Sequence, residues 1–384
     1  MNDNKELGIY IHIPFCKQKC YYCDFVSYVD TVERMNKYIE KLKEEIINEK
    51  NIYQNDYNVT TIYIGGGTPS ILEKEHIKDI LDILKEQLKN NKTKFQDIEI
   101  TIEVNPRTAE EEKLKQYKES GINRLSIGLQ STNDNLLKEI GRIHNYQDFL
   151  TTYNMAKKIG FENINIDLMI GLPNQTIKDL KNAIQEIKRL NPNHVSVYSL
   201  IVEEGTKIEQ LLDQKILELP DEDLERKMYW YVKNSLELLG YNHYEISNFA
   251  KPRKESKHNL NCWEQKEYIG LGLAAHSYIN GIRYGNTNNL KEYIETTNFQ
   301  KIKNIEEEQT LEDRKKEYML LGLRKIQGVS ISKFKEKYIE NPLYLFRNEL
   351  KKLVDEGLIK IDLDTIKLTN KGLNLANIVW EEFI

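Results

Sequence analysis

The chain has 384 residues, of which 40% are hydrophobic and 30% charged, and its formal net charge is −5 at neutral pH. This balance is typical of a soluble globular protein, and the negative charge argues against a main role in binding nucleic acid. The sequence lacks both an apolar run that could span a bilayer and the apolar core of a signal peptide. We therefore expect a cytoplasmic protein of two or three structural units, with at most peripheral membrane contact.

Short β-branched or aliphatic runs alternate with segments of helical spacing in the first half of the chain. Predicted strands cover residues 8–13, 61–64, 98–104, 124–129, 164–170 and 194–201, and predicted helices include residues 32–48, 74–88, 109–119 and 176–190. Such alternation indicates βαβ units and a parallel sheet. Six units are too few for a closed eight-stranded barrel, so we predict an α/β fold with a partial (β/α)6 barrel and chemistry at the carboxyl ends of its strands.

Three of the four cysteines follow the first predicted strand, at the spacing Cys16-x3-Cys20-x2-Cys23. Thiolates crowded on one loop are typical ligands of a soft metal centre. A 4Fe-4S cluster usually takes four cysteine ligands, so three leave one iron open to an outside ligand. A structural zinc site is the alternative, but the second Cys or His pair that closes such sites is missing nearby. Cysteines used in this way favour a reducing compartment.

The residues around these cysteines resemble a known family. An aromatic residue, Tyr22, precedes the last cysteine, as in the radical S-adenosylmethionine (SAM) superfamily, and the string from Tyr10 to Cys16 is similar to that of the oxygen-independent coproporphyrinogen III oxidase-like family. The resemblance implies that Cys16, Cys20 and Cys23 hold a 4Fe-4S cluster and that SAM chelates the open iron. It also implies the partial barrel that the periodicity predicts.

Polar motifs stand at the ends of the later predicted strands. Gly66-Gly67-Thr68 follows the second strand, where residues without side chains let the backbone approach a ligand, although a glycine run alone indicates only a tight turn. Asp167 interrupts the apolar fifth strand, so it faces a polar cavity or pairs with Arg124 or Arg142. The resemblance implies SAM contacts by Gly66, Gly67, Thr68, Glu103, Gln130, Arg142 and Asp167, with Tyr10 and Tyr22 as aromatic neighbours of the cofactor.

Beyond residue 205 the alternation fades into a predicted helix at residues 221–239 and a loop that carries His258-Asn259-Leu260-Asn261-Cys262-Trp263. His258 and Cys262 can both ligate haem iron, and Trp263 and Tyr268 offer flat surfaces to a porphyrin, although such residues are common in loops. The motif resembles His-Asn-x-x-Tyr-Trp of the haem-chaperone branch of the family, HemW, which implies haem binding through His258. Cys262 replaces the usual tyrosine, and the alternative is that it packs as a small apolar residue.

Two features are closer to the chaperone branch than to the oxidase. Phe25 stands where the oxidase carries an additional cysteine, and only a few residues precede the first strand, where the oxidase has a longer segment. The resemblance therefore implies a chaperone that binds the cluster, SAM and haem and transfers haem to acceptor proteins, of the respiratory class. The alternative is an oxygen-independent coproporphyrinogen III oxidase that decarboxylates its substrate by radical SAM chemistry.

The C-terminal residues predict a separate winged-helix-like α+β unit. Helices at residues 311–326, 331–338 and 345–356 precede a hairpin at residues 357–368 and a final helix. Winged helices often bind DNA, but acids such as Glu336, Glu349 and Asp355 lie among the lysines here, so we expect packing or partner docking. The predicted domains are the barrel at residues 1–240, a haem-motif and connecting region at 241–303, and the winged-helix-like domain at 304–384.

Overall fold

The computed structural model describes residues 5–55 and 57–384. Its centre is a twelve-stranded sheet in the order β12-β11-β10-β9-β1-β2-β3-β4-β5-β6-β8-β7. The first half of the chain supplies β1 (Lys5–Ile13), α1 (Val32–Asn48), α2 (Lys50–Asn55), β2 (Tyr57–Gly66), η1 (Pro69–Ile71), α3 (Lys74–Gln87), η2 (Phe95–Asp97), β3 (Glu99–Val104), α4 (Glu111–Glu119), β4 (Arg124–Gln130), α5 (Asp134–Glu139), α6 (Tyr146–Ile159), β5 (Asn163–Ile170), α7 (Ile177–Leu190) and β6 (His194–Ser199).

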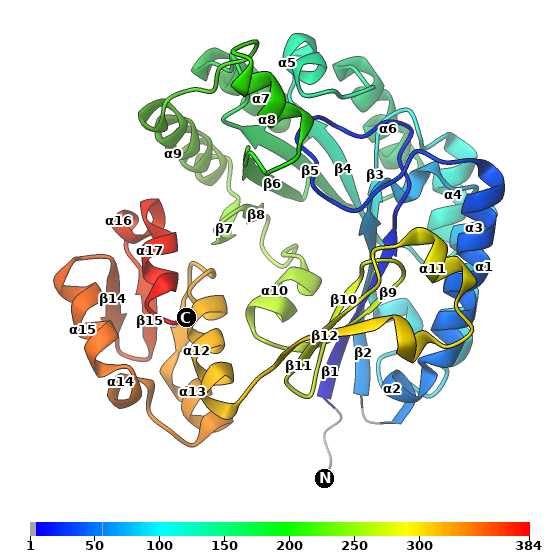
Figure 1. Ribbon diagram of the computed structural model, residues 1–384. Helices are drawn as coiled ribbons and strands as arrows, with labels where there is room; N and C mark the ends of the chain where they lie inside the picture. Colours follow the sequence, from blue (N-terminus) through cyan, green and yellow to red (C-terminus); the bar gives the residue numbers. More distant parts are fainter. Residues whose placement is uncertain (1–4, 56) are drawn as a thin grey trace.

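The strands β1 to β6 are all parallel and curve into an open arc, with helices on its outer side (Figure 1). This confirms the predicted partial (β/α)6 barrel. Parallel neighbours need a crossover between them, and the helices that provide it cover one face of the sheet. All six carboxyl ends therefore meet at one edge of the arc.

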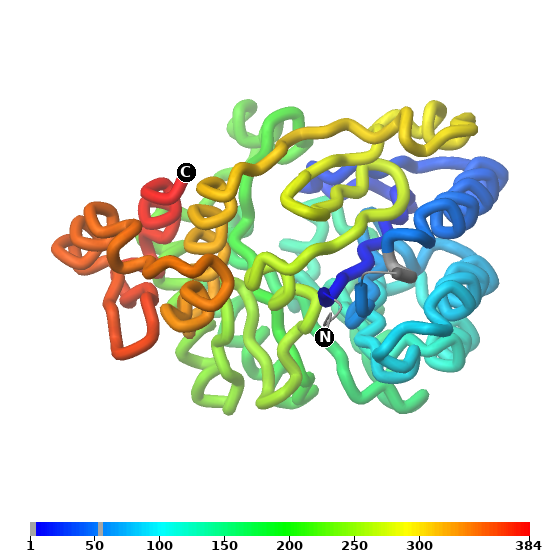
Figure 2. The backbone as a smooth tube through the Cα atoms, turned by 90° about the horizontal axis from the view of Figure 1, so that it is seen from below, coloured from blue at the N-terminus to red at the C-terminus, as the bar shows by residue number. Residues whose placement is uncertain are grey.

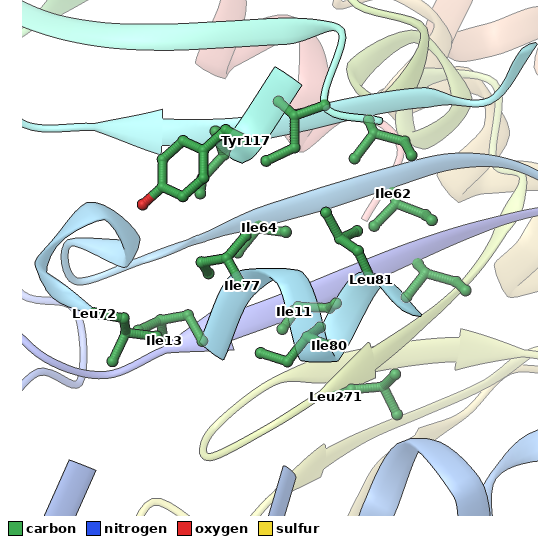
Figure 3. Packing of buried hydrophobic residues seen from close by; sticks show 14 of the residues in the cluster. Ile11, Ile13, Ile62, Ile64, Leu72, Ile77, Ile80, Leu81, Tyr117 and Leu271 are labelled. Carbon is green, nitrogen blue, oxygen red and sulfur yellow. The ribbon is translucent and has the colours of Figure 1, made fainter. Parts of the chain in front are cut away.

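Alternation along each strand divides its side chains between the two faces of the sheet. Ile62 and Ile64 of β2 are fully buried and belong to the same apolar core as Ile77 and Leu81 of α3 (Figure 3). The residue between them, Tyr63, points to the other face, into the barrel interior, where it lines a cavity. The apolar outer layer thus holds the strands in place while the inner face remains available for polar side chains.

Short strands extend the sheet at both edges, and they were not predicted. The elements after β6 are α8 (Lys207–Asp213), α9 (Glu222–Leu238), β7 (Asn242–Glu245), β8 (Asn248–Ala250), α10 (Lys257–Trp263), β9 (Glu267–Leu271), β10 (His276–Ile279), β11 (Ile282–Asn286), α11 (Leu290–Glu295), η3 (Phe299–Ile302) and β12 (Lys303–Glu308). Strand β9 lies parallel to β1, whereas β8 lies antiparallel to β6. Where the chain divides between the predicted domains stays a prediction.

The segment predicted as a loop around His258 is a helix, α10. Ser256 is its N-cap, and the Ser256 side chain accepts a hydrogen bond from the Asn259 N–H at 3.3 Å. The expectation was wrong because seven residues are too few to display a helical repeat of apolar positions. Polar residues such as Asn259 and Asn261 also favour loops when the sequence is considered alone.

The C-terminal elements are α12 (Leu311–Gly322), β13 (Val329–Ser330), α13 (Ile331–Tyr338), α14 (Pro342–Leu345), α15 (Arg347–Asp355), β14 (Ile359–Asp362), β15 (Thr365–Leu368), α16 (Asn370–Asn374) and α17 (Ala376–Glu381). They form the predicted winged-helix-like domain, with a sheet in the order β13-β15-β14 and its own core around Phe334 and Phe383. This domain forms one end of the molecule (Figure 2). None of the helices in the described part of the chain combines the length and apolar character needed to cross a membrane.

Candidate metal and cofactor site

The loop that follows β1 crosses the edge of the barrel where the carboxyl ends of the parallel strands meet (Figure 1). Cys16, Cys20 and Cys23 belong to this loop. Its backbone is fastened on both sides, because the Tyr21 N–H donates to the Ile140 carbonyl at 3.0 Å and the Tyr21 carbonyl accepts from the Ile208 N–H at 2.8 Å. All three cysteines line one cavity. The predicted cluster ligands therefore converge.

The environment of these thiols suits a metal cluster. Cys16 accepts a hydrogen bond from Thr68 Oγ1 at 3.4 Å, and Cys20 accepts one from Arg142 Nη1 at 3.5 Å. Burial raises the pKa of Cys16 and raises the pKa of Cys23 to about 11, so ionisation at neutral pH needs a bound cationic centre. The described cysteines form no disulfide.

The grouping of ligands argues against the zinc alternative. Among the residues that the structure describes, no three Cys, His, Asp or Glu side chains are grouped tightly enough to hold a single metal ion. A zinc ion needs its ligands around one point, whereas the thiolates of an iron–sulfur cluster bind separate iron atoms. The described residues therefore offer no closed zinc site, and the cluster assignment stays a prediction.

The cavity has a volume of about 510 Å³, within the range of small-molecule sites. It is built from the carboxyl ends of the parallel strands together with the cysteine loop. Eleven of the thirteen predicted site residues line it, namely Cys16, Cys20, Cys23, Tyr22, Gly66, Gly67, Thr68, Glu103, Gln130, Arg142 and Asp167. Tyr10 and His258 lie elsewhere in the barrel interior.

The glycine run at the end of β2 brings the backbone to the cavity surface. Gly66 has φ +110°, and a Cβ atom there would lie 2.6 Å from the His12 ring. A Cβ atom on Gly67 would lie 2.8 Å from the Phe15 carbonyl oxygen. Only glycine fits at these two positions, because the backbone there packs directly against His12 and Phe15. The glycine run is therefore more than a tight turn.

Glu103, at the end of β3, is held from two sides. The Tyr63 hydroxyl donates to Oε1 at 2.9 Å, and the Gly66 N–H donates to Oε2 at 3.3 Å. Burial raises the pKa of Glu103 to about 7, and the nearby Asp167 carboxylate acts in the same direction. A ligand that brings positive charge or hydroxyl donors into the cavity would favour the ionised form.

Asp167 faces the cavity among polar partners, as its position in an apolar strand predicted. Its carboxylate accepts from Asn165 Nδ2 at 2.7 Å and from Ser126 Oγ at 3.2 Å. Burial raises the pKa of Asp167. Two half-buried carboxylates, Asp167 and Glu103, thus share one cavity, an arrangement that suits a ligand with cationic groups such as the sulfonium and ammonium of SAM.

Arg142 is fixed on the wall beside the cysteine loop. Its Nη2 donates to Asn105 Oδ1 at 3.1 Å and to the Gly128 carbonyl at 3.3 Å. Next to it, Gln130 adopts φ +63°, a conformation that is costly for a residue with a side chain. The cavity therefore holds a rigid cation as well as two carboxylates, which matches the mixed charge of an amino-acid ligand.

Two residues of the predicted haem motif, His258 and Asn261, are buried. His258 is 9% exposed, and its Nδ1 lies 2.9 Å from Thr61 Oγ1. Burial lowers the pKa of His258 to about 4, and the Arg124 guanidinium acts in the same direction, so the imidazole is neutral. Burial raises the pKa of Cys262 to about 11, so its thiol is neutral as well.

The aromatic residues named for the porphyrin already have partners. The Arg324 guanidinium lies 4.5 Å from the ring centroids of both Trp263 and Trp380. The Tyr268 hydroxyl accepts from Arg283 Nη1 at 3.1 Å. In this conformation one face of Trp263 is covered by a cation from the C-terminal segment.

Several cavity residues were not predicted. Tyr63, Ser126, Met169 and Tyr198 line it from β2, β4, β5 and β6. The available signal was strand alternation, which places every second residue near a carboxyl end on the inner face. That rule alone does not separate a binding residue from a packing residue.

The chain matches known proteins along nearly its whole length. The radical SAM superfamily profile matches residues 10–187, and the HemN C-terminal domain profile matches residues 309–375. The heme chaperone HemW of Bacillus subtilis is 42% identical over 98% of this chain and 98% of its own length. The heme chaperone HemW of Lactococcus lactis is 39% identical over 99% and 98%, respectively.

A solved structure shares the whole architecture. Coproporphyrinogen III oxidase (HemN) from Escherichia coli, described as a radical SAM enzyme, is 26% identical with a TM-score of 0.84, and the match covers 99% of this chain and 90% of that one. The sequence identity to the two HemW proteins, 42% and 39%, is higher than the 26% identity to HemN. With three cysteines at the open edge of such a barrel, the chain belongs to the HemW family of the radical SAM superfamily.

Proposed function

We propose that this protein is a haem chaperone that binds a 4Fe-4S cluster, SAM and haem and transfers haem to acceptor proteins. One observation carries the proposal, namely the similarity along nearly the full length to proteins named heme chaperones. The acceptors we propose are respiratory proteins. The protein would act in the cytoplasm, with at most peripheral contact with a membrane.

The cluster and SAM belong to the cavity at the barrel edge. Cys16, Cys20 and Cys23 would hold the cluster, and the carboxylates of Glu103 and Asp167 would contact SAM. The other proposed SAM contacts are Tyr22, Gly66, Gly67, Thr68, Gln130 and Arg142. SAM bound to the cluster would either be cleaved to start radical chemistry or be bound without cleavage. The charges of the cavity support this assignment, because they balance those of SAM.

Haem would bind through His258, whose neutral imidazole is a suitable iron ligand. The imidazole is nearly buried, so haem can reach it only if α10 moves out of the barrel. For Cys262 we favour packing over iron ligation, since its thiol has a raised pKa and a strong axial ligand must be a thiolate.

The experiment is a haem transfer assay with anaerobically reconstituted protein. Haem-loaded wild type should restore oxidase or reductase activity to membrane vesicles from haem-starved cells, and His258→Ala should not retain haem. The exposed Arg347 offers a control, because Arg347→Ala leaves α10 untouched. Vesicle activation by free haem alone, with no gain from the loaded protein, would refute the chaperone proposal.

The second candidate is an oxygen-independent coproporphyrinogen III oxidase, which the structural similarity to HemN favours. Phe25 is the observation against it. Phe25 is 61% exposed at the edge of the cavity, where it offers an apolar surface and no reactive group. The two candidates differ in whether coproporphyrinogen is consumed.

A further inference from the structure

The first turn of α10 closes the end of the barrel opposite the cysteine loop, and it is anchored by the sheet. Glu99, at the start of β3, accepts hydrogen bonds from the Lys257 N–H and the His258 N–H, both at 3.2 Å. Asn261 Nδ2 donates to Thr60 Oγ1 of β2 at 3.3 Å. The two hydrogen bonds to Glu99 fix where the His258 side chain enters the barrel, whereas the Asn261 contact holds the later turn of α10 against β2.

The His258 imidazole then fills the interior between β1 and β2. Its Nδ1 is paired with Thr61 Oγ1, and its ring centroid lies 5.2 Å from that of Tyr63 with the planes 30° apart. On the β1 side, a Cβ atom on Gly8 would come within 3.3 Å of His258 Cε1. The ring is therefore enclosed by the sheet and packs directly on Tyr63.

Tyr63 connects this packing to the cavity. Its ring also stacks on Tyr10, with centroids 6.2 Å apart and planes at 27°. With two aromatic neighbours the ring has little rotational freedom, so its hydroxyl is aimed at Glu103 Oε1, 2.9 Å away. A chain of three side chains, His258, Tyr63 and Glu103, thus runs from the haem motif to the proposed SAM site.

We infer that His258 is a positioning residue for the SAM cavity: it holds Tyr63, Tyr63 holds Glu103, and withdrawal of His258 to bind haem lowers the affinity for SAM. This inference rests on the proposed function, because it takes haem and SAM as the two ligands. Linkage makes the effect reciprocal, so bound SAM also lowers the affinity of His258 for haem by the same factor. Haem loading and SAM release would then be coupled steps.

The test measures SAM affinity in haem-free protein with an intact cluster. Loss of a hydrogen bond to an ionised carboxylate costs at least about 1.5 kcal/mol, so Tyr63→Phe should weaken SAM binding roughly tenfold and His258→Ala by a similar factor. The double variant should be no weaker than Tyr63→Phe alone, because His258 acts through Tyr63. Asn261→Ala is the matched control, since it loosens α10 on β2 without touching Tyr63.

A pH profile separates positioning from general loosening. The charged and titratable groups that face Glu103 are Tyr63 of β2, Arg124 of β4 and Asp167 of β5. The hydrogen bond from Tyr63 lowers the pKa of Glu103. Loosening Tyr63 removes that effect, so the pH midpoint of SAM binding should rise in His258→Ala and in Tyr63→Phe. Asn261→Ala should leave the midpoint unchanged.

Two results would overturn the inference: wild-type SAM affinity and midpoint in His258→Ala, or equal losses in Asn261→Ala. If His258→Ala does not fold, Thr61→Val decides, because it keeps the imidazole and removes only its hydrogen-bond partner. Haem retention is measured separately. Wild type that never retains haem refutes the proposed function, whereas wild type that binds SAM equally well with and without haem refutes the coupling alone.

Discussion

The thiols of Cys16 and Cys20 each accept a hydrogen bond from a different side chain, and in a 4Fe-4S cluster each of the three thiolates would bind a separate iron atom. A serine in place of Cys20 offers a hard oxygen instead of a soft sulfur. We therefore expect Cys20→Ser to lose most of its iron and sulfide after anaerobic reconstitution. Cys262→Ser is the control and should keep the full content, because Cys262 lies on α10. Normal cluster content in Cys20→Ser would remove the thiol from the ligand set.

The raised pKa of Glu103, about 7, predicts that SAM binding depends on pH. SAM brings positive charge, so it binds best when the carboxyl is ionised, and its affinity should fall as the pH drops through about 7. Glu103→Gln should bind SAM more than tenfold more weakly and should lose this dependence. Isothermal titration between pH 6 and 8 measures both effects. A wild-type affinity that is flat across this range would contradict the role of Glu103.

At this scale the sequence predicted residues with distinctive chemistry. The cysteines, the glycine run and the carboxylates all line the cavity because strand ends of a parallel sheet meet at one edge. Tyr63 was missed because nothing in a single sequence distinguishes it from other strand tyrosines. The burial of His258 was missed for a related reason, since contacts between β2 and α10 join positions 197 residues apart.

Among the elements, α1 is tied to the antiparallel extension by one buried carboxylate. Glu45 accepts hydrogen bonds from the Gly272 N–H at 2.7 Å, Asn286 Nδ2 at 2.7 Å and the Tyr293 hydroxyl at 2.5 Å. Burial raises the pKa of Glu45 from 4.5 to about 6, so the folded state holds this proton more tightly than the unfolded chain. The free energy of unfolding contributed by Glu45 is therefore highest below pH 4.5 and falls as the pH rises to about 6.

That loss amounts to about 2 kcal/mol, from 1.36 kcal/mol per pKa unit. Glu45→Gln removes the titration and also mismatches the donors, so we expect a less stable variant whose stability changes less between pH 4.5 and 6.5. Denaturant unfolding at several pH values gives the difference between the two curves. Parallel curves for wild type and Glu45→Gln would show that this carboxyl does not titrate in that range.

Elements with strong periodicity were predicted closely, and short polar ones were not. The helix expected at residues 32–48 is α1, with Thr31 as its N-cap, because its apolar positions repeat at helical spacing. Strand β12 spans Lys303–Glu308, and its last five residues are all exposed, so it has no apolar alternation to detect. Its pairing with β11 depends on long-range contacts.

At the scale of the whole molecule, Arg324 joins the barrel to the C-terminal domain. Its guanidinium lies between Trp263 of α10 and Trp380 of α17, and the Ile246 N–H donates to its carbonyl at 3.1 Å. Two cation–π contacts at partly buried sites contribute about 1–2 kcal/mol together. We expect Arg324→Ala to lower the melting temperature by about 1–3 °C. Exposed Arg347 is the matched control, and an equal shift in Arg347→Ala would mean that the stacking contributes nothing specific.

The overall architecture could be predicted from the order in which strand-like and helix-like spacings of apolar residues follow one another along the sequence. Alternating strands and helices can close only into a parallel α/β layer, and helices before a hairpin predict the C-terminal domain. Sequence pattern could not predict that residues 242–308 pair with both edges of the barrel sheet, because edge pairing is decided by the strand already present there.

The central claim, a haem chaperone on a radical SAM barrel, is tested most directly by one anaerobic preparation offered two porphyrin ligands. Wild-type protein with a full cluster is incubated with reductant and SAM, and with either haem or coproporphyrinogen III. We predict that haem stays bound through gel filtration and that coproporphyrinogen III is recovered unchanged. Consumption of coproporphyrinogen III that depends on SAM, with no retention of haem, would contradict the account and make the protein an oxidase.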